Sequence, residues 1–111
     1  MTREFIYTEI FEKQWQTLGF TASDALLLEK MLIDDPHLGD VIEGTGGLRK
    51  VRFAYEGRGK SGSARVCYVD VAVSEKIIFI TCFGKSEKDN LSKEEKNAIK
   101  KLVTILKSHY I

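Results

Sequence analysis

The sequence predicts an α+β domain of the order βααβββα, in which a small antiparallel sheet packs against two N-terminal helices and a C-terminal helix. Three observations favour this class. Apolar residues recur at helical spacing near both ends, three β-prone runs follow one another in the middle, and an S-x-x-E capping box precedes the last helical pattern. The 111 residues, 43% of them hydrophobic, are enough for one core. We therefore expect a single domain over residues 1–111.

The N-terminal third begins with a short strand and continues with two helices. Residues 3–7 are typical of a strand, and the threonine after them can cap a helix over about 9–18. A second helix begins after Thr21 or Ser23, either of which can cap it. It ends at Asp35, because the next residue is a proline.

The strands of the sheet come next and the last helix follows them. The β-prone runs cover residues 48–55, 64–73 and 76–83. Because they are consecutive, an antiparallel meander is expected. Ser92 and Glu95 form the capping box of a helix over about 93–108. We expect the helices to pack on one face of the sheet.

The composition excludes several classes of protein. No apolar run approaches the ~20 residues of a membrane span, and the N-terminal residues lack the apolar core of a secretion signal. We therefore expect a cytoplasmic protein that has no membrane partner. Cys67 and Cys82 each lie in an apolar run, which predicts buried, reduced thiols. No Cys/His spacing suggests zinc, so we expect neither a metal nor a cofactor.

Charge is segregated along the chain. Residues 1–48 carry a net charge of -6, residues 49–65 carry +5 and residues 66–111 carry +2. The basic segment 49–65 holds six Lys and Arg, and its Lys50 and Arg52 share one face of the strand that carries them. Clustered cations attract polyanions and steer their approach, which favours a phosphate-binding surface. The alternative is that this run is simply a solvent-exposed charged strand that binds no ligand.

Two nucleotide-binding motifs in the basic segment are misleading. Residues 57–62 match G-x-G-x-x-G, but β-branched residues follow where a dinucleotide site needs a helix. Gly59, Lys60 and Ser61 mimic the end of a P-loop, yet the glycine required five positions earlier is Ala54. Neither motif predicts a nucleotide cofactor.

Two stretches carry a resemblance to a known family. GDVIEGTGGLRKVRFAYEGRGKSGSARVCY at residues 39–68, followed by FGKSEKDNLS at 83–92, resembles the RelE/ParE toxin superfamily and, within it, the HigB-like branch. Toxins of this type belong to type II toxin-antitoxin modules, bind the ribosomal A site and cleave the mRNA there. The resemblance implies a ribosome-dependent endoribonuclease (an mRNA interferase) that inhibits translation. It also implies that the RNA's own 2'-hydroxyl attacks the scissile phosphate without a metal.

The resemblance implies roles for individual residues. Arg65 matches the phosphate-clamping arginine, Lys50 and Arg52 match paired basic residues of the preceding strand, and Lys85 and Lys88 match the basic end of the last strand. These five residues are the implied catalytic set. The implied RNA- and ribosome-binding set is Arg49, Arg58, Lys60 and Phe83.

The residue types are compatible with this chemistry. Arginine donates two hydrogen bonds to a phosphate, and a lysine among like charges can have a depressed pKa and assist proton transfer. One position departs from the family. Many relatives have tyrosine before Gly-Lys, whereas this chain has Phe83, which can stack or pack but cannot transfer a proton. Tyr68 and Tyr110 are the tyrosines that could compensate, although Tyr68 is better explained as a core or sheet residue.

Two other function classes stay open. One is a non-enzymatic inhibitor of DNA gyrase, as in the ParE branch, and the other is an inactive nucleic-acid-binding domain. For the favoured enzyme, the resemblance implies three partners: mRNA, the ribosome with its 16S rRNA at the A site, and a cognate antitoxin. In HigB-like modules the antitoxin is usually a HigA-like helix-turn-helix protein.

Overall fold

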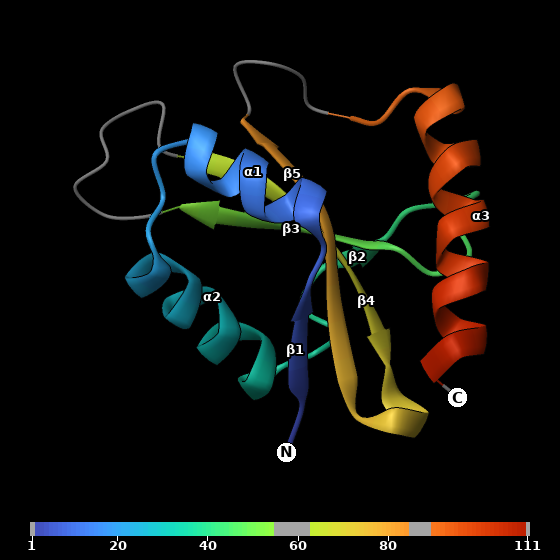
Figure 1. The fold of residues 1–111 in the computed structure, drawn as a ribbon, viewed down its shortest axis with the longest axis horizontal. Coiled ribbons are helices and arrows are strands. Elements are labelled where there is room, and N and C mark those ends of the chain that lie inside the picture. The colour runs from blue at the N-terminus through green and yellow to red at the C-terminus, as the bar shows by residue number, and fades with distance from the viewer. Residues whose placement is uncertain (1, 55–62, 85–89, 111) are drawn as a thin grey trace.

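The centre of the molecule is a five-stranded sheet of the order β1-β5-β4-β3-β2 (Figure 1). The computed structural model describes residues 2–54, 63–84 and 90–110. The strands are β1 (Glu4–Tyr7), β2 (Asp40–Val41), β3 (Arg49–Ala54), β4 (Ser63–Val71) and β5 (Lys76–Gly84). A 3-10 turn, η1 (Ala72–Ser74), joins the last two. The α+β class and the predicted order of elements are confirmed, and β2 is an additional short strand within the predicted glycine loop.

The three predicted consecutive strands form the expected antiparallel meander, in which β3 pairs with β4 and β4 with β5. The sheet as a whole is mixed, because β1 pairs with β5 in parallel, with Glu4 opposite Lys76. This parallel pair joins residues about 70 positions apart in the chain. The expectation of an antiparallel sheet therefore holds for the meander and not for its β1 edge.

Threonine caps begin both N-terminal helices. In α1 (Glu9–Thr17), the Thr8 hydroxyl accepts a hydrogen bond from a backbone N–H of the first turn at 3.2 Å. In α2 (Ala22–Asp34), Thr21 and Asp24 form a reciprocal capping box. Thr21, rather than Ser23, is thus the N-cap of α2.

The C-terminal helix α3 (Lys93–Tyr110) begins at the predicted capping box. The Glu95 carboxylate accepts from the Ser92 N–H at 2.8 Å, and the Ser92 hydroxyl accepts from the Glu95 N–H at 3.1 Å. The helix is two residues longer than predicted. No helix among the described residues is both long and apolar enough to cross a membrane.

The helices cover both faces of the sheet, which corrects the expectation that they pack on one face. Phe11, Leu28 and Val66 belong to the core on the α1/α2 face, whereas Cys67 and Val103 belong to a second core under α3 (Figure 1). The physical reason is the composition of β4, in which residues 64–69 are all buried. A strand that is apolar on both faces needs a cover on both. Both cysteines are buried free thiols, as predicted.

Tyr68 ties the connection between α2 and β2 to the middle of the sheet. Its side chain is fully buried, and its hydroxyl donates to the Pro36 carbonyl at 2.8 Å and accepts from the Gly39 N–H at 3.0 Å. A Cβ at Gly39 would stand 2.9 Å from the backbone of Lys50, so only glycine permits this close approach. Tyr68 is a core residue, as the sequence indicated.

A glycine loop connects β2 to β3 and contacts α3. The Lys107 ammonium donates to the Gly46 carbonyl at 2.9 Å, and the Lys100 side chain passes over the same glycine. Gly47 has a φ of +114°, and a Cβ there would come within 2.8 Å of the Lys107 nitrogen. The loop and one flank of α3 therefore form a continuous surface.

Candidate functional site

A row of side chains crosses the three central strands on the face that α3 covers. The register sets Arg52 of β3 opposite Arg65 of β4, and Arg65 opposite Phe83 of β5. Lys50, two residues before Arg52, lies opposite Cys67, which belongs to the core under α3. Because directly paired residues point to the same side of a sheet, the structure brings Lys50, Arg52 and Arg65 together on one face.

Arg65 is the buried member of this row. Only 6% of its surface is exposed, and its guanidinium donates to the Ser63 hydroxyl at 3.1 Å. Ser63 lies two positions earlier on β4 and thus on the same face. Arg52, directly across, is exposed. Like charges in such cross-strand positions destabilise a sheet, so the Arg52–Arg65 pair is a poor choice for folding alone.

Lys50 links the row to the segment before α3. Its ammonium donates to the side-chain carbonyl of Asn90 at 2.8 Å. Asn90 was not singled out from the sequence, and no local pattern marks it, since the two residues are 40 positions apart. The hydrogen bond joins β3 to the start of α3 on the same face as Arg52 and Arg65.

Four predicted site residues lie outside the described residues: Arg58, Lys60, Lys85 and Lys88. The described residues next to the second pair are Gly84, which pairs with Ala64 of β4, and Asn90, which binds Lys50. Gly84 and Asn90 both lie beside the basic row.

Arg49 points away from the row. It lies opposite Tyr68, a member of the core on the α1/α2 face. Its guanidinium donates to the Gly39 carbonyl at 2.8 Å and to the His37 carbonyl at 3.5 Å. These bonds hold the connection between α2 and β2, on the opposite side of the sheet from Arg52 and Arg65.

Phe83 lies in the row but is buried. It is 2% exposed and belongs to the core that contains Leu91 and Val103. Packing therefore accounts for the ring, and stacking on a base would require it to become exposed. Neither candidate tyrosine is close to it. Tyr68 belongs to the core on the other face, and Tyr110 lies at the far end of α3, with the Lys76 ammonium 5.9 Å from its ring centre.

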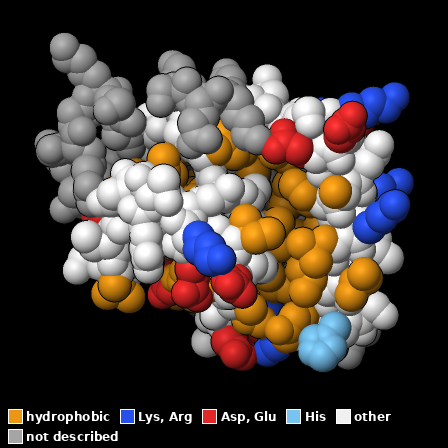
Figure 2. All heavy atoms as spheres, turned by 45° about the horizontal axis from the view of Figure 1, so that its top comes forward, with side chains coloured by type: hydrophobic (Ala, Val, Ile, Leu, Met, Phe, Trp, Pro, Cys, Tyr) orange, Lys and Arg blue, Asp and Glu red, His pale blue; other side chains and the backbone are white. Residues whose placement is uncertain are grey.

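An apolar groove of about 340 Å³ adjoins the row. Figure 2 shows hydrophobic side chains gathered along this side of the molecule, where α1 and α3 flank β5. The residues that line the groove include Ile10, Gln14, Phe83, Ala98, Ile99 and Leu102. The Gln14 side chain accepts a hydrogen bond from the Cys82 N–H at 3.1 Å, so α1 covers this part of the β5 edge.

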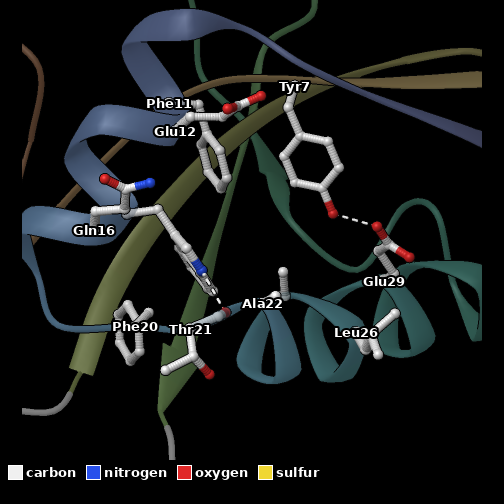
Figure 3. Close-up of a pocket in the computed structure, with 11 residues that line it drawn as sticks. Tyr7, Phe11, Glu12, Gln16, Phe20, Thr21, Ala22, Leu26 and Glu29 are labelled. Atoms are coloured by element: carbon white, nitrogen blue, oxygen red, sulfur yellow. Dashed lines mark hydrogen bonds between the residues drawn. The ribbon is translucent and has the colours of Figure 1, made fainter.

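A larger pocket of about 580 Å³ lies on the α1/α2 side. Figure 3 shows Tyr7 donating to the Glu29 carboxylate on one side of this pocket, with Phe11 beside the Tyr7 ring and Phe20 at the opposite end. Burial first, and then the hydrogen bond to Glu29, raise the pKa of Tyr7 above its usual value. None of the basic residues of the row lines this pocket. The pocket is lined by the Tyr7 hydroxyl and by the carboxylates of Glu12 and Glu29, so it does not suit a phosphate.

The row itself suits a polyanion. Guanidinium and ammonium groups bind phosphate oxygens through charge-assisted hydrogen bonds, and arginine can bind two oxygens at once. In the part of the chain that the structure describes, no cluster of His, Cys, Asp and Glu could hold a metal ion.

Comparisons with known proteins agree with the fold. A family model described as "RelE toxin of RelE / RelB toxin-antitoxin system" matches residues 23–110. Among solved structures, the chain is similar to an arginine-to-alanine double mutant of the E. coli toxin RelE in the free state. The TM-score is 0.53 at 18% sequence identity, and the alignment covers 78% of this chain and 86% of the other. At this identity the structural likeness supports the fold.

Proposed function

The chain belongs to the RelE toxin family of toxin-antitoxin systems, and from this premise we propose that it is a ribosome-dependent endoribonuclease that cleaves mRNA in the ribosomal A site. Membership of the family implies a cognate antitoxin. We propose that the chain lies in the HigB-like branch and that its antitoxin is a HigA-like helix-turn-helix protein. The observation that carries the proposal is the row of Lys50, Arg52 and Arg65 on one face of the sheet.

The row supports one step of the cleavage directly. The RNA 2'-oxygen forms a bond to phosphorus while the bond to the 5'-oxygen breaks, which leaves a 2',3'-cyclic phosphate and a 5'-hydroxyl. Negative charge grows on the phosphate oxygens in the transition state, where fixed cations stabilise it most. In the proposed arrangement Arg65 clamps the phosphate, and Arg52 and Lys50 add positive charge around it.

Proton transfer requires further groups. The 2'-hydroxyl must lose a proton and the departing 5'-oxygen must gain one. Phe83 can do neither. We therefore assign proton transfer to lysines, with Lys85 and Lys88 as the proposed candidates beside Lys50. Arg58 and Lys60 are proposed to contact the RNA backbone or the ribosome.

The test combines translation with a matched pair of arginine variants. Wild-type protein, Arg65→Ala and Arg49→Ala are compared in a translation reaction with purified ribosomes, and new mRNA 5'-ends are mapped. We expect cleavage only when ribosomes are present, and its loss in Arg65→Ala while the variant stays folded. Arg49→Ala removes the same charge from the opposite face. Cleavage retained in Arg49→Ala would support an active surface on the α3 face, whereas cleavage lost in an Arg49→Ala variant that stays folded would place Arg49 in that surface.

A supercoiling assay with purified gyrase separates the two branches of the superfamily. Intact mRNA together with inhibited gyrase would move the protein to the ParE-like function and refute the nuclease proposal. Full activity of Arg65→Ala would remove this residue from the site.

A further inference from the structure

Four of the five lysines of α3 lie on one flank of the helix. They are Lys93, Lys96, Lys100 and Lys107. At about 100° per residue these positions fall within an arc of about 60°, whereas Lys101 points elsewhere. The contacts of Lys100 and Lys107 with the glycine loop orient this lysine flank toward the β3 side of the sheet. The helix is thus asymmetric, because its other flank forms a wall of the apolar groove through Ala98 and Leu102 (Figure 2).

Helix stability does not explain the lysine flank. Lys93 is the first residue of α3, where the helix dipole disfavours a cation. Lys96 follows it by three positions and precedes Lys100 by four, so like charges are neighbours twice. Lys93, Lys96 and Lys100 form no ion pair within the described part of the chain. An arrangement that costs the helix stability and has no counter-charge among the residues that the structure describes is suited to an external anion.

The lysine flank is continuous with the basic row. Its first residue, Lys93, comes three positions after Asn90, whose side chain binds Lys50 of the row. From Lys93 to Lys107 the helix extends the positive surface by about 21 Å. This length spans several successive phosphates of a nucleic-acid strand.

We propose that the lysine flank of α3 binds the sugar-phosphate backbone of RNA, as an extension of the site that holds the scissile phosphate. The inference rests on the proposed function for its choice of RNA as the polyanion. Contacts of this kind position a strand without reading its sequence. Their signature is a steep dependence of affinity on salt, because each neutralised phosphate releases counterions.

The test compares two triple variants of equal charge. K93Q/K96Q/K100Q neutralises the flank, and K13Q/K30Q/K101Q neutralises three exposed lysines elsewhere. Lys107 is left intact because it also holds the glycine loop. The probe is a single-stranded 2'-O-methyl RNA, which the proteins can bind but cannot cleave through a 2'-hydroxyl. Its affinity is measured over a series of KCl concentrations.

We expect the slope of log K against log salt to fall by about 2 in magnitude for the flank variant and to stay unchanged for the control. The flank variant should unfold at the same temperature as wild type or higher, since repulsion is removed. Equal slopes for wild type and flank variant, or an equal loss in the control, would overturn the proposal. Unchanged RNA binding with weakened binding of the antitoxin would also overturn it and assign the flank to an acidic protein segment. Because the probe cannot be cleaved, its binding is measured separately from nuclease activity, and a failure of this proposal is distinguishable from a failure of the nuclease proposal.

Discussion

Replacing Tyr68 with phenylalanine tests whether the hydroxyl holds the connection between α2 and β2. The substitution keeps the buried ring and removes only the oxygen, which bonds the Pro36 carbonyl at 2.8 Å and the Gly39 N–H at 3.0 Å. Both backbone groups then lose their partner in the interior. A buried group left unsatisfied costs about 1–3 kcal/mol. Two such groups at the lower end of this range predict a loss of ~2 kcal/mol in the free energy of unfolding.

The assay is reversible unfolding in urea and by heat, with Tyr110→Phe as the matched control. Tyr110 is partly exposed at the end of α3, and its hydroxyl makes no hydrogen bond within the described residues. For a chain of this size, ~2 kcal/mol lowers the melting temperature by about 8 °C. The control should shift the melting temperature by less than about 2 °C. An equal effect in both variants would refute the argument, as would no effect in Tyr68→Phe.

The difference in unfolding free energy between wild type and Tyr68→Phe should depend on pH, in a direction that the pKa of Tyr68 determines. Burial raises the pKa of the Tyr68 hydroxyl above its ordinary value of 10.0. The folded state therefore holds this proton more tightly than the unfolded state. The resulting stability is complete below pH 10 and decreases as the pH rises through the folded pKa. The stability difference between wild type and Tyr68→Phe should accordingly narrow above pH 10, and a difference that widens there would contradict the assignment.

Two further substitutions test the start of α3 and its link to the row. Asn90→Ala removes the hydrogen-bond acceptor for Lys50. It should lower the rate of mRNA cleavage about 3- to 10-fold, which is the rate equivalent of one hydrogen bond, and leave the urea midpoint of unfolding unchanged. A lowered midpoint with a normal cleavage rate would show that the contact is structural only. Ser92→Ala removes the N-cap of α3 and should lower the free energy of unfolding in urea by about 1 kcal/mol. Ser92→Asp, which can still cap the helix, should restore that stability. Unchanged stability in Ser92→Ala would mean that the capping bond is not formed in solution.

Local signals in the sequence were enough to locate the helices and the meander. The capping box at Ser92 and Glu95 fixed the start of α3, because its two hydrogen bonds need only neighbouring residues. The parallel pairing of β1 with β5 depends on contacts across the whole chain, which no local pattern reports. The sequence did contain a signal that helices cover both faces of the sheet. Residues 64–69 of β4 are almost continuously apolar, as expected for a strand covered on both faces.

The candidate site was predictable to the extent that it follows strand alternation. Lys50 and Arg52 were expected on one face, and the register confirms that they share it. The register places Arg49 on the opposite face, although the family resemblance grouped it with the RNA-binding residues. That Arg65 lies opposite Arg52 depends on the pairing of β3 with β4, and residue spacing alone does not fix that register across a loop. The anchor at Asn90 depends on the tertiary fold in the same way.

The parallel pairing of β1 with β5 has a consequence for biosynthesis. Phe5 and Phe79 stack with their ring centres 5.8 Å apart, and Phe11 stacks on the same Phe79 at 4.9 Å. The ribosome synthesises Phe5 and Phe11 more than sixty residues before Phe79. The N-terminal segments therefore leave the exit tunnel before their core exists, and folding must wait until β5 has emerged. A toxin assembled in this order cannot complete its sheet, and the basic row that crosses it, before residues 76–84 have been translated.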